Sequence, residues 1–296
     1  MTALHQLPTL KMKIDGKKIS ENVLNDLKSK VTALKKKNIT PHLAIILIGE
    51  DPASKAYVNQ KKIKGELIGA NISIHHFDDV LSEKELKEFV EDLNKDSSVH
   101  GIIIQRPLPL QIDETKTREM VALKKDVDGF LPNSKFDEPI AEAVLEILKT
   151  IFSDIQIRKS QEEGSSCINI KDWLKLNKIV VVGKGDTGGR PIINLFKKMG
   201  INITIVDSKT KKPGEVVKSA DILISTVGKP VIFSNEVRKG AIVIGIGMRK
   251  GDDGKLTPDY NQEEIANIAS YYTPVPGGVG PVNVAMLLKN LIDSTE

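Results

Sequence analysis

The stretch of the chain with the clearest chemical pattern spans residues 178–191 and reads K-I-V-V-V-G-K-G-D-T-G-G-R-P. A β-branched apolar run ends at the start of a G-x-G-x-x-G pattern made by Gly183, Gly185 and Gly188. A helical apolar period then begins at Ile192. Glycines let the backbone approach a ligand closely, and the free N–H groups of a helix N-terminus attract a pyrophosphate. The pattern therefore predicts a strand, a turn and a helix that bind a dinucleotide.

A second strand and an acidic residue follow this turn at the spacing of a nucleotide-binding unit. The apolar segment 203–206 ends at Asp207, close to the place where a carboxylate contacts a cofactor ribose in a βαβ fold. A lone G-x-G-x-x-G also fits a plain tight turn. Two more buried strands, 221–225 and 241–246, follow in order, and the first of them ends in Thr226-Val227-Gly228. The favoured interpretation is a Rossmann-type sheet.

A helix in the first half of the chain carries polar groups on one face. It opens after the buried run 42–48, and its polar residues recur at helical spacing as Ser54, Tyr57, Lys61 and Lys64. The simplest interpretation is a solvated face with a few lysines. Its position favours a ligand, because ligands collect at the carboxyl ends of strands in open α/β sheets.

Two loops of the same half carry further polar groups. The buried strand 100–104 stops at Gln105, because the prolines that follow cannot continue a central strand. This places Gln105 beside the start of the Tyr57 helix. Asp126 and Asp128 flank a valine in the turn D-V-D-G-F. Two acids in a turn usually cap it, so this pair alone indicates no chemistry.

The segment 273–281 is unusually dense in glycine and proline and reads T-P-V-P-G-G-V-G-P. Such density predicts a rigid loop that exposes its backbone and can lie against a flat ligand. A structural turn rarely needs so many of these residues. The candidate ligand-binding positions in this loop are Pro276, Gly277 and Gly278.

Composition excludes several classes of function. The net charge is only +4 with both signs interspersed, and aromatic residues make up 4% of the 296 residues, so neither a nucleic-acid surface nor a membrane surface is expected. No apolar run reaches the length of a membrane span. The single cysteine, Cys167, excludes an internal disulfide and a multi-thiolate metal site. We expect a cytoplasmic protein with a small-molecule site and no metal.

Helical periodicity and capping residues place the elements that must position these groups. Helices are expected after Ser20, a plausible N-cap, and after Ser82, which opens a capping box. Two more are expected at residues 139–150 and 282–291. The mixed segment 151–172 is interpreted as an insertion or surface loop.

These elements predict an α/β protein of two domains with a cleft between them. Residues 1–140 are expected to form an N-terminal three-layer α/β substrate domain, and residues 141–281 a C-terminal Rossmann-type dinucleotide-binding domain. The last helix, within 282–296, is expected to pack back on the first domain.

Taken together, these stretches closely resemble the methylenetetrahydrofolate dehydrogenase/methenyltetrahydrofolate cyclohydrolase family. The resemblance spans nearly the whole chain in the family's order. It is carried by Gly49–Ser54, Tyr57-Val58 with Lys61, Gln105 with Pro107-Leu108-Pro109, Lys125–Phe130, the glycine turn with Pro191, and Thr273–Pro281.

The resemblance implies a bifunctional enzyme and names its site residues. It implies oxidation of 5,10-methylenetetrahydrofolate by hydride transfer to NADP+, then hydrolysis of the methenyl product to 10-formyltetrahydrofolate, by a homodimer. The implied folate and catalytic residues are Tyr57, Lys61, Gln105 and Asp128, with Ser54 and the 276–278 loop also touching substrate. The implied cofactor residues are Gly183, Lys184, Gly185, Gly188, Asp207, Ser208, Lys209, Thr226 and Gly228.

The choice between NADP and NAD rests on opposing charges. Family members that use NADP place cations and hydroxyl groups after the first glycine and after the second strand, where this chain has Lys184 and Asp207-Ser208-Lys209-Thr210. Lys184 and Lys209 favour a 2′-phosphate. Asp207 favours a ribose diol and repels a phosphate. We expect NADP, provided that Asp207 turns away to cap the following turn, with NAD as the alternative.

The chain departs from the family pattern at a few positions, and other functions fit the same architecture. Arg106 stands where leucine is common, Glu138-Pro139-Ile140-Ala141 where Pro-Cys-Thr-Pro is common, Gly245 where aspartate is common, and Val282-Asn283 where Met-Thr is common. The alternatives are an NAD-linked dehydrogenase with weak or no cyclohydrolase activity, a dehydrogenase of another small substrate, and a noncatalytic nucleotide-binding regulator.

Overall fold

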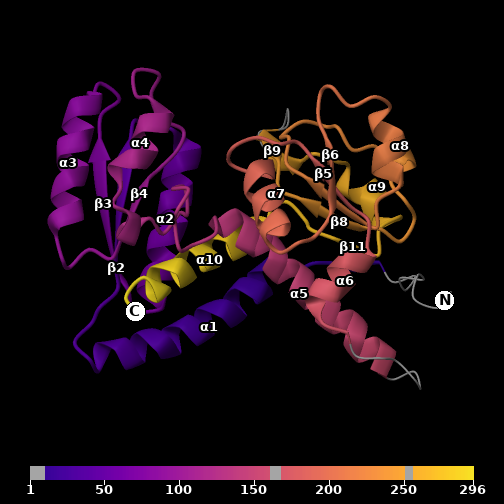
Figure 1. The fold of residues 1–296 in the computed structure, drawn as a ribbon, viewed down its shortest axis with the longest axis horizontal. Helices are drawn as coiled ribbons and strands as arrows, with labels where there is room; N and C mark the ends of the chain where they lie inside the picture. Colours follow the sequence, from indigo (N-terminus) through magenta and orange to yellow (C-terminus); the bar gives the residue numbers. More distant parts are fainter. Residues whose placement is uncertain (1–10, 161–167, 251–255) are drawn as a thin grey trace. The chain divides into compact units, whose positions relative to one another are not determined.

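A computed structural model describes residues 11–160, 168–250 and 256–296, so Cys167 lies outside the described residues. The chain divides into two compact units, each built from two segments (Figure 1). One contains Ser20–Pro139 and Val284–Glu296, and the other contains the residues before Ser20 and Ile140–Asn283. We call them the three-stranded unit and the six-stranded unit after their main sheets.

The three-stranded unit is built on a parallel sheet in the order β3-β2-β4. Strand β2 (His42–Ile48) lies in the middle and is apolar along its length, because both of its faces are covered. Strand β3 (Asn71–Phe77), N-I-S-I-H-H-F, was not predicted: as an edge strand it exposes alternate residues and lacks a continuous apolar run. Strand β4 is Gly101–Ile104. The helices of the three-stranded unit are α2 (Pro52–Leu67), α3 (Glu83–Lys95), α4 (Glu114–Met120) and most of α1 (Gly16–Lys35).

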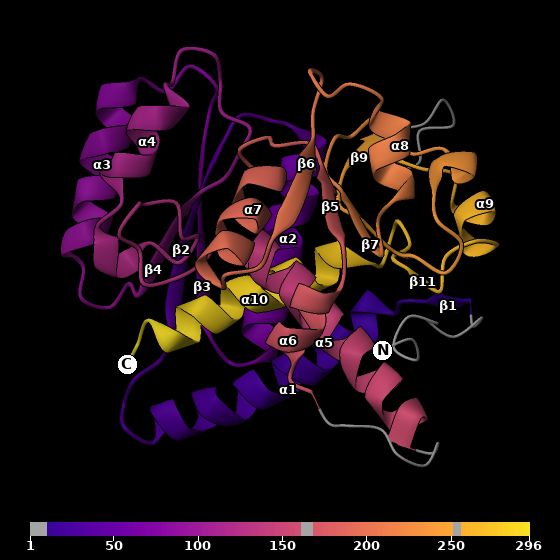
Figure 2. The same cartoon turned by 45° about the vertical axis from the view of Figure 1, so that its right-hand side comes forward.

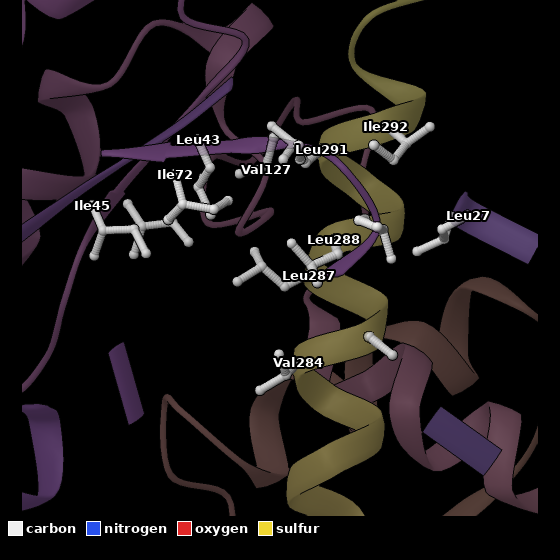
Figure 3. Packing of buried hydrophobic residues seen from close by; sticks show 14 of the residues in the cluster. Leu27, Leu43, Ile45, Ile72, Val127, Val284, Leu287, Leu288, Leu291 and Ile292 are labelled. Atoms are coloured by element: carbon white, nitrogen blue, oxygen red, sulfur yellow. The ribbon is translucent and has the colours of Figure 1, made fainter. Parts of the chain in front are cut away.

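Two separate apolar clusters cover the two faces of this sheet, which makes the unit three-layered as predicted. On one face, Leu43, Ile45 and Ile103 pack with α1, Val58 of α2 and the end of α10 (Val279–Asp293). Helix α10 contributes Val284, Leu287, Leu288, Leu291 and Ile292 (Figure 3). On the other face, Ile46 and Ile104 pack with Leu86 and Val90 of α3. Helix α10 therefore covers part of one face of this sheet, and Val284–Glu296 group with the three-stranded unit.

The six-stranded unit is a parallel sheet in the order β1-β11-β8-β7-β5-β6. Its central strands β5 (Ile179–Val182), β7 (Ile222–Ser225) and β8 (Ile242–Gly245) are buried throughout, as expected of strands covered on both faces. Helix α7 (Gly189–Lys198) lies against β5 and β6 (Ile203–Val206) (Figure 2). The remaining elements of this unit are β1 (Met12–Lys13), α5 (Pro139–Ser160), α6 (Ile170–Leu176), α8 (Pro213–Lys218), β9 (Met248–Lys250), β10 (Leu256–Pro258), α9 (Gln262–Ala266), β11 (Tyr271–Tyr272) and a short 3₁₀ turn, Ser234–Glu236. The three-stranded unit has a 3₁₀ turn of its own, Leu123–Lys125.

Two local expectations differ from the structure. Ser20 does not cap α1, which already begins at Gly16 because the Asp15 carboxylate accepts a hydrogen bond from Lys18 N–H at 3.1 Å. The segment 151–172 is not all loop: α5 continues to Ser160, and Phe152 packs against Trp173 with 5.5 Å between ring centroids. Residues 161–167 of that segment lie outside the described residues.

The first described residues group with the six-stranded unit, whereas the sequence assigned residues 1–140 to one domain. The reason is β1, which pairs with β11 in parallel: Met12 N–H donates to Ser270 O and Ile14 N–H donates to Tyr272 O, both at 2.8 Å. A two-residue strand followed by a charged helix gives no periodic signal, so sequence alone could not place it.

Truncating α10 in the core of the three-stranded unit should destabilise that unit. Leu291 is fully buried against β2 and Val127, so we expect Leu291→Ala to cost about 2–5 kcal/mol through lost burial and a residual cavity. Hydrogen exchange of β2 amides measures this free energy in the correct unit. The matched control is Leu67→Ala on α2, where the side chain is 55% exposed. Equal exchange in the two variants would contradict the packing described here.

Candidate active site

A buried lysine and an amide form the centre of the polar cluster in the three-stranded unit. Lys61, on α2, is 6% exposed, and its Nζ donates a 2.9 Å hydrogen bond to Gln105 Oε1 just past the end of β4. Gln105 is held in turn, because its Nε2 donates to Arg106 O at 2.6 Å. The Lys61 ammonium also lies 5.1 Å from the centre of the Tyr57 ring. The structure therefore brings together three of the predicted site residues.

The start of α2 fixes the orientation of this helix and engages Ser54. Asp51 is the N-cap, and its carboxylate accepts from both the backbone N–H and the hydroxyl of Ser54 at 2.7 Å. Pro52 occupies the first turn, where its missing N–H costs nothing. The Ser54 side chain is buried and its Oγ also lies 3.4 Å from Arg106 O. Ser54 therefore ties the helix start to the loop after β4.

The D-V-D-G-F turn brings Asp128 to the same cluster. Lys125 anchors the turn, because its buried ammonium donates to Leu93 O and Asp96 O at the end of α3, at 2.6 and 2.5 Å. Asp126 is the capping acid and accepts from Phe130 N–H and Leu131 N–H at 3.2 and 2.9 Å. The two acids thus have different roles. Asp126 caps the turn, whereas the charge of Asp128 acts on the Lys61 ammonium.

Burial sets the protonation chemistry of this pair. Loss of solvent lowers the pKa of Lys61 and raises the pKa of Asp128, and each group's charge partly opposes the shift of the other. The result is a lysine that releases a proton more readily than an exposed one. A group with its pKa lowered in this way suits proton transfer.

A second carboxyl group with a perturbed pKa lies near Asp128. Burial, followed by repulsion from Asp128, raises the pKa of Glu138 to about 8. The cations Arg118 and Arg106 oppose this rise. The sequence showed Glu138 and Arg106 as departures from the family pattern but gave no sign that their charges act on one another.

The glycine turn of the six-stranded unit has the close approaches that a phosphate-binding turn requires. Gly183 has φ +94°, and a Cβ there would lie 2.6 Å from Thr226 Oγ1. Gly185 has no heavy atom within 4 Å of its Cβ position, so a ligand can approach its backbone. The helix-packing glycine is Gly189, whose Cβ would lie 2.1 Å from Gly183 O. Sequence reasoning missed Gly189, although the Gly188-Gly189 doublet was the available signal.

The charged groups after the turn and after β6 pair with one another. Lys184 Nζ lies 2.6 Å from Asp207 Oδ2. Asp207 Oδ1 also accepts from Lys209 N–H at 3.0 Å and from the Thr210 hydroxyl at 3.2 Å. The Lys184 contact, then the backbone contact of Lys209, lowers the pKa of Asp207 to about 2. Asp207 therefore does cap the following turn, while Ser208 and Lys209 keep exposed side chains.

The last two predicted cofactor positions lie after β7. Thr226 Oγ1 donates to Val182 O at 3.0 Å and so joins β7 to the glycine turn. Gly228 has φ +72°. The adjacent Val227 N–H donates to Asp259 Oδ2 at 2.9 Å. The Asp259 carboxylate is fully buried. All nine predicted cofactor residues belong to the six-stranded unit.

The glycine- and proline-rich loop belongs to the six-stranded unit and is rigidly held. Gln262 clamps it, because its side-chain oxygen accepts from Val275 N–H and its nitrogen donates to Val275 O, both at 2.9 Å. Gly278 is buried against the start of α1, where a Cβ on Gly16 would lie 1.8 Å from Gly278 O. Pro276 is exposed. The pattern predicted the rigid loop, but Gln262 had no signal in the sequence.

The glycine that replaces the family's aspartate is explained by a neighbouring tyrosine. A Cβ on Gly245 would lie 2.6 Å from Tyr260 Cε1. Burial raises the pKa of Tyr260, and its hydroxyl group hydrogen-bonds to the Thr273 carbonyl oxygen. Thr273 Oγ1 accepts from Gly245 N–H at 2.8 Å. The aromatic ring therefore fills the space at Gly245 and binds the start of the loop.

The described residues show neither a candidate metal site nor a candidate membrane-spanning helix. No group of three or more His, Cys, Asp or Glu side chains within 11–160, 168–250 and 256–296 is arranged to hold a metal ion. Across that same part of the chain, no helix is long and apolar enough to span a bilayer.

A Rossmann-type sheet with a glycine turn, together with a buried Lys-Gln-Asp cluster on a second parallel sheet, defines an NAD(P)-binding enzyme of the α/β class. A model of the tetrahydrofolate dehydrogenase/cyclohydrolase catalytic domain matches residues 14–128, and a model of the NAD(P)-binding domain of the same enzymes matches residues 168–296. The chain belongs to the tetrahydrofolate dehydrogenase/cyclohydrolase family. The predicted family resemblance and fold class are confirmed.

Individual relatives agree over nearly the whole length. The bifunctional protein FolD of Ligilactobacillus salivarius is 38% identical over 290 residues, which is 96% of each chain. The crystal structure of the bifunctional FolD of Campylobacter jejuni superposes with a TM-score of 0.86 at 33% identity, covering 96% of this chain and 98% of that one. The Trypanosoma brucei FolD, solved with NADP and an inhibitor, gives 0.83 at 28% identity and covers 96% of each chain.

The raised pKa of Glu138 predicts a pH-dependent cost to stability. As pH rises from the usual carboxyl value of 4.5 toward about 8, the unfolded chain releases a proton that the folded unit retains, so stability falls over that window. Glutamine cannot ionise. We expect Glu138→Gln to unfold at the same temperature as wild type near pH 4.5 and at a higher temperature at pH 8.

Thermal unfolding followed by circular dichroism between pH 4.5 and 9 tests this expectation. Glu119→Gln, at an exposed position of the same unit, controls for exchanging a carboxyl for an amide. A constant difference between Glu138→Gln and wild type across the window would contradict the shifted titration.

Proposed function

We infer that the chain oxidises 5,10-methylenetetrahydrofolate to the methenyl form with NADP+ and hydrolyses that product to 10-formyltetrahydrofolate. The observation that carries this inference is the buried Lys61–Gln105 hydrogen bond with Asp128 facing the amine. A dehydrogenase alone has no need of a buried lysine with a lowered pKa, whereas a hydrolysis step must move a proton. Membership of the family supports both activities.

The oxidation step requires alignment more than proton transfer. The nicotinamide supplies the hydride acceptor when it is bound, and the folate nitrogen supplies the electron push. In the six-stranded unit, the open backbone at Gly185 and the start of α7 fit a pyrophosphate. In the three-stranded unit, Asp128 is proposed to accept hydrogen bonds from the pterin amino and ring N–H groups, with Tyr57 beside it.

The hydrolysis step is assigned to Lys61. Water must add to an amidinium-like carbon, and the proton it loses must go to a base. Lys61 can take that proton because burial lowers the pKa of its amine. Gln105 accepts a hydrogen bond from the amine at 2.9 Å and so fixes the direction of its remaining lone pair or proton. Gln105 is proposed to orient the base, and Ser54 to position the helix that carries it.

The cofactor is proposed to be NADP, held at its 2′-phosphate by Lys184, Ser208 and Lys209. The support is the conformation of Asp207, whose carboxylate is turned onto its own turn and onto Lys184. It thus has fewer lone pairs left for a ribose diol. The same ion pair favours the alternative, an NAD-linked enzyme, to the extent that it neutralises Lys184.

The proposal extends to the setting of the enzyme. Its partners are tetrahydrofolate derivatives and a second copy of the chain, with the six-stranded unit forming the dimer contact, and its location is the cytoplasm. The support for these points is the family membership and the even distribution of charge, with a net of +4.

Replacing Lys61 should separate the two activities. We expect Lys61→Met to reduce methenyl hydrolysis by about 100-fold or more, the usual contribution of a positioned acid or base, and to leave measurable oxidation. Absorbance of the methenyl product and of the reduced cofactor reports both reactions in one assay. The control is Lys62→Met, because Lys62 is the next residue of α2 and is 44% exposed. Equal loss of both activities, in a folded protein that binds folate, would mean that Lys61 only positions the substrate.

Removing the Asp207 charge should strengthen the preference for NADP+. Asp207→Asn releases Lys184 from a 2.6 Å ion pair, so we expect kcat/KM for NADP+ to rise about threefold and the value for NAD+ to fall. The control is Glu215→Gln, which breaks the exposed 2.7 Å pair with Lys212, because neither of these residues is a predicted cofactor residue. A wild-type preference for NAD+ that Asp207→Asn reverses would overturn the choice of NADP.

A further inference from the structure

Arg106 and Gln105 are adjacent in sequence but contact different elements. Gln105 hydrogen-bonds with Lys61 of α2. The Arg106 side chain is only 12% exposed, and its guanidinium carbon lies 4.4 Å from the centre of the Phe130 ring. This stacking holds a cation within the D-V-D-G-F turn. Leucine, which is common here in the family, would supply the apolar contact without the charge.

The Arg106 guanidinium lines a cavity together with Asp128. The same cavity is bordered by Asp126, Arg118 and Phe130. Arg106 Nη1 is buried and makes no hydrogen bond to any residue in the described part of the chain, and its ion-pair partner Glu114 is 3.6 Å away at Oε2. Arg106 is therefore held for its charge and its packing, with Asp128 within electrostatic reach.

We propose that Arg106 is a positioning residue for the hydrolysis step, acting through Asp128. It supplies a permanent counter-charge that keeps Asp128 a carboxylate while Lys61 gives up its proton. The inference rests on the proposed function only in naming hydrolysis as the step that uses this state. A leucine at this position would leave Asp128 without this cation.

The charged groups that act on Asp128 come from several elements. Lys61 faces it from α2, Arg106 from the loop after β4, and Asp126 from its own turn. Glu138, from the segment before α5, also acts on it. Arg118 and Glu114, both on α4, act on Arg106.

Charge balance in a poorly solvated site explains this role. The active state, with a neutral Lys61 amine and an ionised Asp128 carboxyl, has lost the last proton of the pair. Without Arg106 this state leaves the carboxylate beside Asp126 and without its guanidinium neighbour, which is costly. With Arg106 the Asp128–Arg106 pair is neutral. Whether Lys61 or Asp128 carries the last proton, that proton is released at lower pH when Arg106 is present.

Glu138 allows the counter-charge to act on Asp128. Because burial and the Asp128 charge raise the pKa of Glu138 to about 8, this carboxyl is mostly neutral below that pH and adds little negative charge beside Arg106. An ordinary glutamate would instead compete with Asp128 for the guanidinium. The two departures from the family pattern, Arg106 and Glu138, thus form one arrangement.

The test compares Arg106→Leu with wild type across pH. We expect the acid limb of kcat/KM for methenyl hydrolysis to move up by about one pH unit or more, the usual effect of removing an adjacent opposite charge from a carboxyl group. Arg106→Lys, which restores a cation, should return the limb toward its wild-type position. Thermal unfolding shows whether each variant is folded.

A second readout follows the proton without any folate chemistry. Labelling of the Lys61 amine by acetic anhydride, read by mass spectrometry, reports the neutral amine. The carboxylic-acid band in infrared difference spectra, assigned with Asp128→Asn, reports the protonated acid. Together they locate the last proton of the pair, and we expect its loss to shift upward in Arg106→Leu by the same amount as the kinetic limb.

Two matched variants isolate the effect. Arg118→Leu removes a cation that borders the same cavity and lies 5.6 Å from the same Phe130 ring. In this variant the Lys61–Asp128 pair should titrate near its wild-type pH. Glu138→Gln removes a nearby carboxyl group whose pKa is raised to about 8, and the Arg106→Leu shift should persist in the double variant.

The results separate the two levels of inference. An unchanged proton titration in folded Arg106→Leu, or an equal shift in Arg118→Leu, overturns the role of Arg106. A wild-type protein that fails to hydrolyse methenyltetrahydrofolate overturns the proposed function, while the labelling and infrared titrations still decide whether Arg106 sets the ionisation of the pair.

Discussion

The cost of burying the Lys61 ammonium is the constraint on which the candidate site depends. An unpaired buried cation is strongly disfavoured, so the surrounding residues must either satisfy it or let it lose its charge. The structure does part of both: Gln105 accepts its hydrogen bond, Tyr57 presents a ring face, and Asp128 supplies an opposing charge. None of these compensates fully, and the pKa of the amine stays lowered. The incomplete compensation is what makes the lysine useful for proton transfer.

The sequence predicted the helices and strands that have a strong local pattern. It failed for features that depend on contacts with distant parts of the chain. Strand β2 was predicted with its observed bounds, because a strand covered on both faces must be continuously apolar. The capping box at Ser82 is present, since its reciprocal hydrogen bonds are local. Strand β1, by contrast, exists only because β11 lies beside it. Ser20 was a reasonable N-cap by residue type, but Asp15 caps the helix earlier in the chain.

The candidate site shows the same division. Position at the carboxyl ends of strands, joined with the family resemblance, selected Lys61, Gln105 and Asp128, and the structure gathers them. The residues that contact Gly245 or act on Arg106 could not be read from the sequence, because they lie at distant positions along the chain. Tyr260 fills the space at Gly245, and Glu138 faces Arg106. A residue that looks anomalous alone is explained once its neighbour in space is known.

The composition of the two units from separate segments has a consequence for synthesis on the ribosome. The core of the three-stranded unit needs Leu287, Leu288 and Leu291, which follow the whole of Ile140–Asn283 in the chain. At about 5–20 residues per second, translation of that intervening segment takes roughly 7–30 s. The six-stranded unit can close first, although most of the other unit was made before it. Until the last helix emerges, Leu43, Ile45 and Ile103 on the sheet lack the α10 part of their covering layer, and the nascent chain is most exposed to chaperones and proteases during that interval.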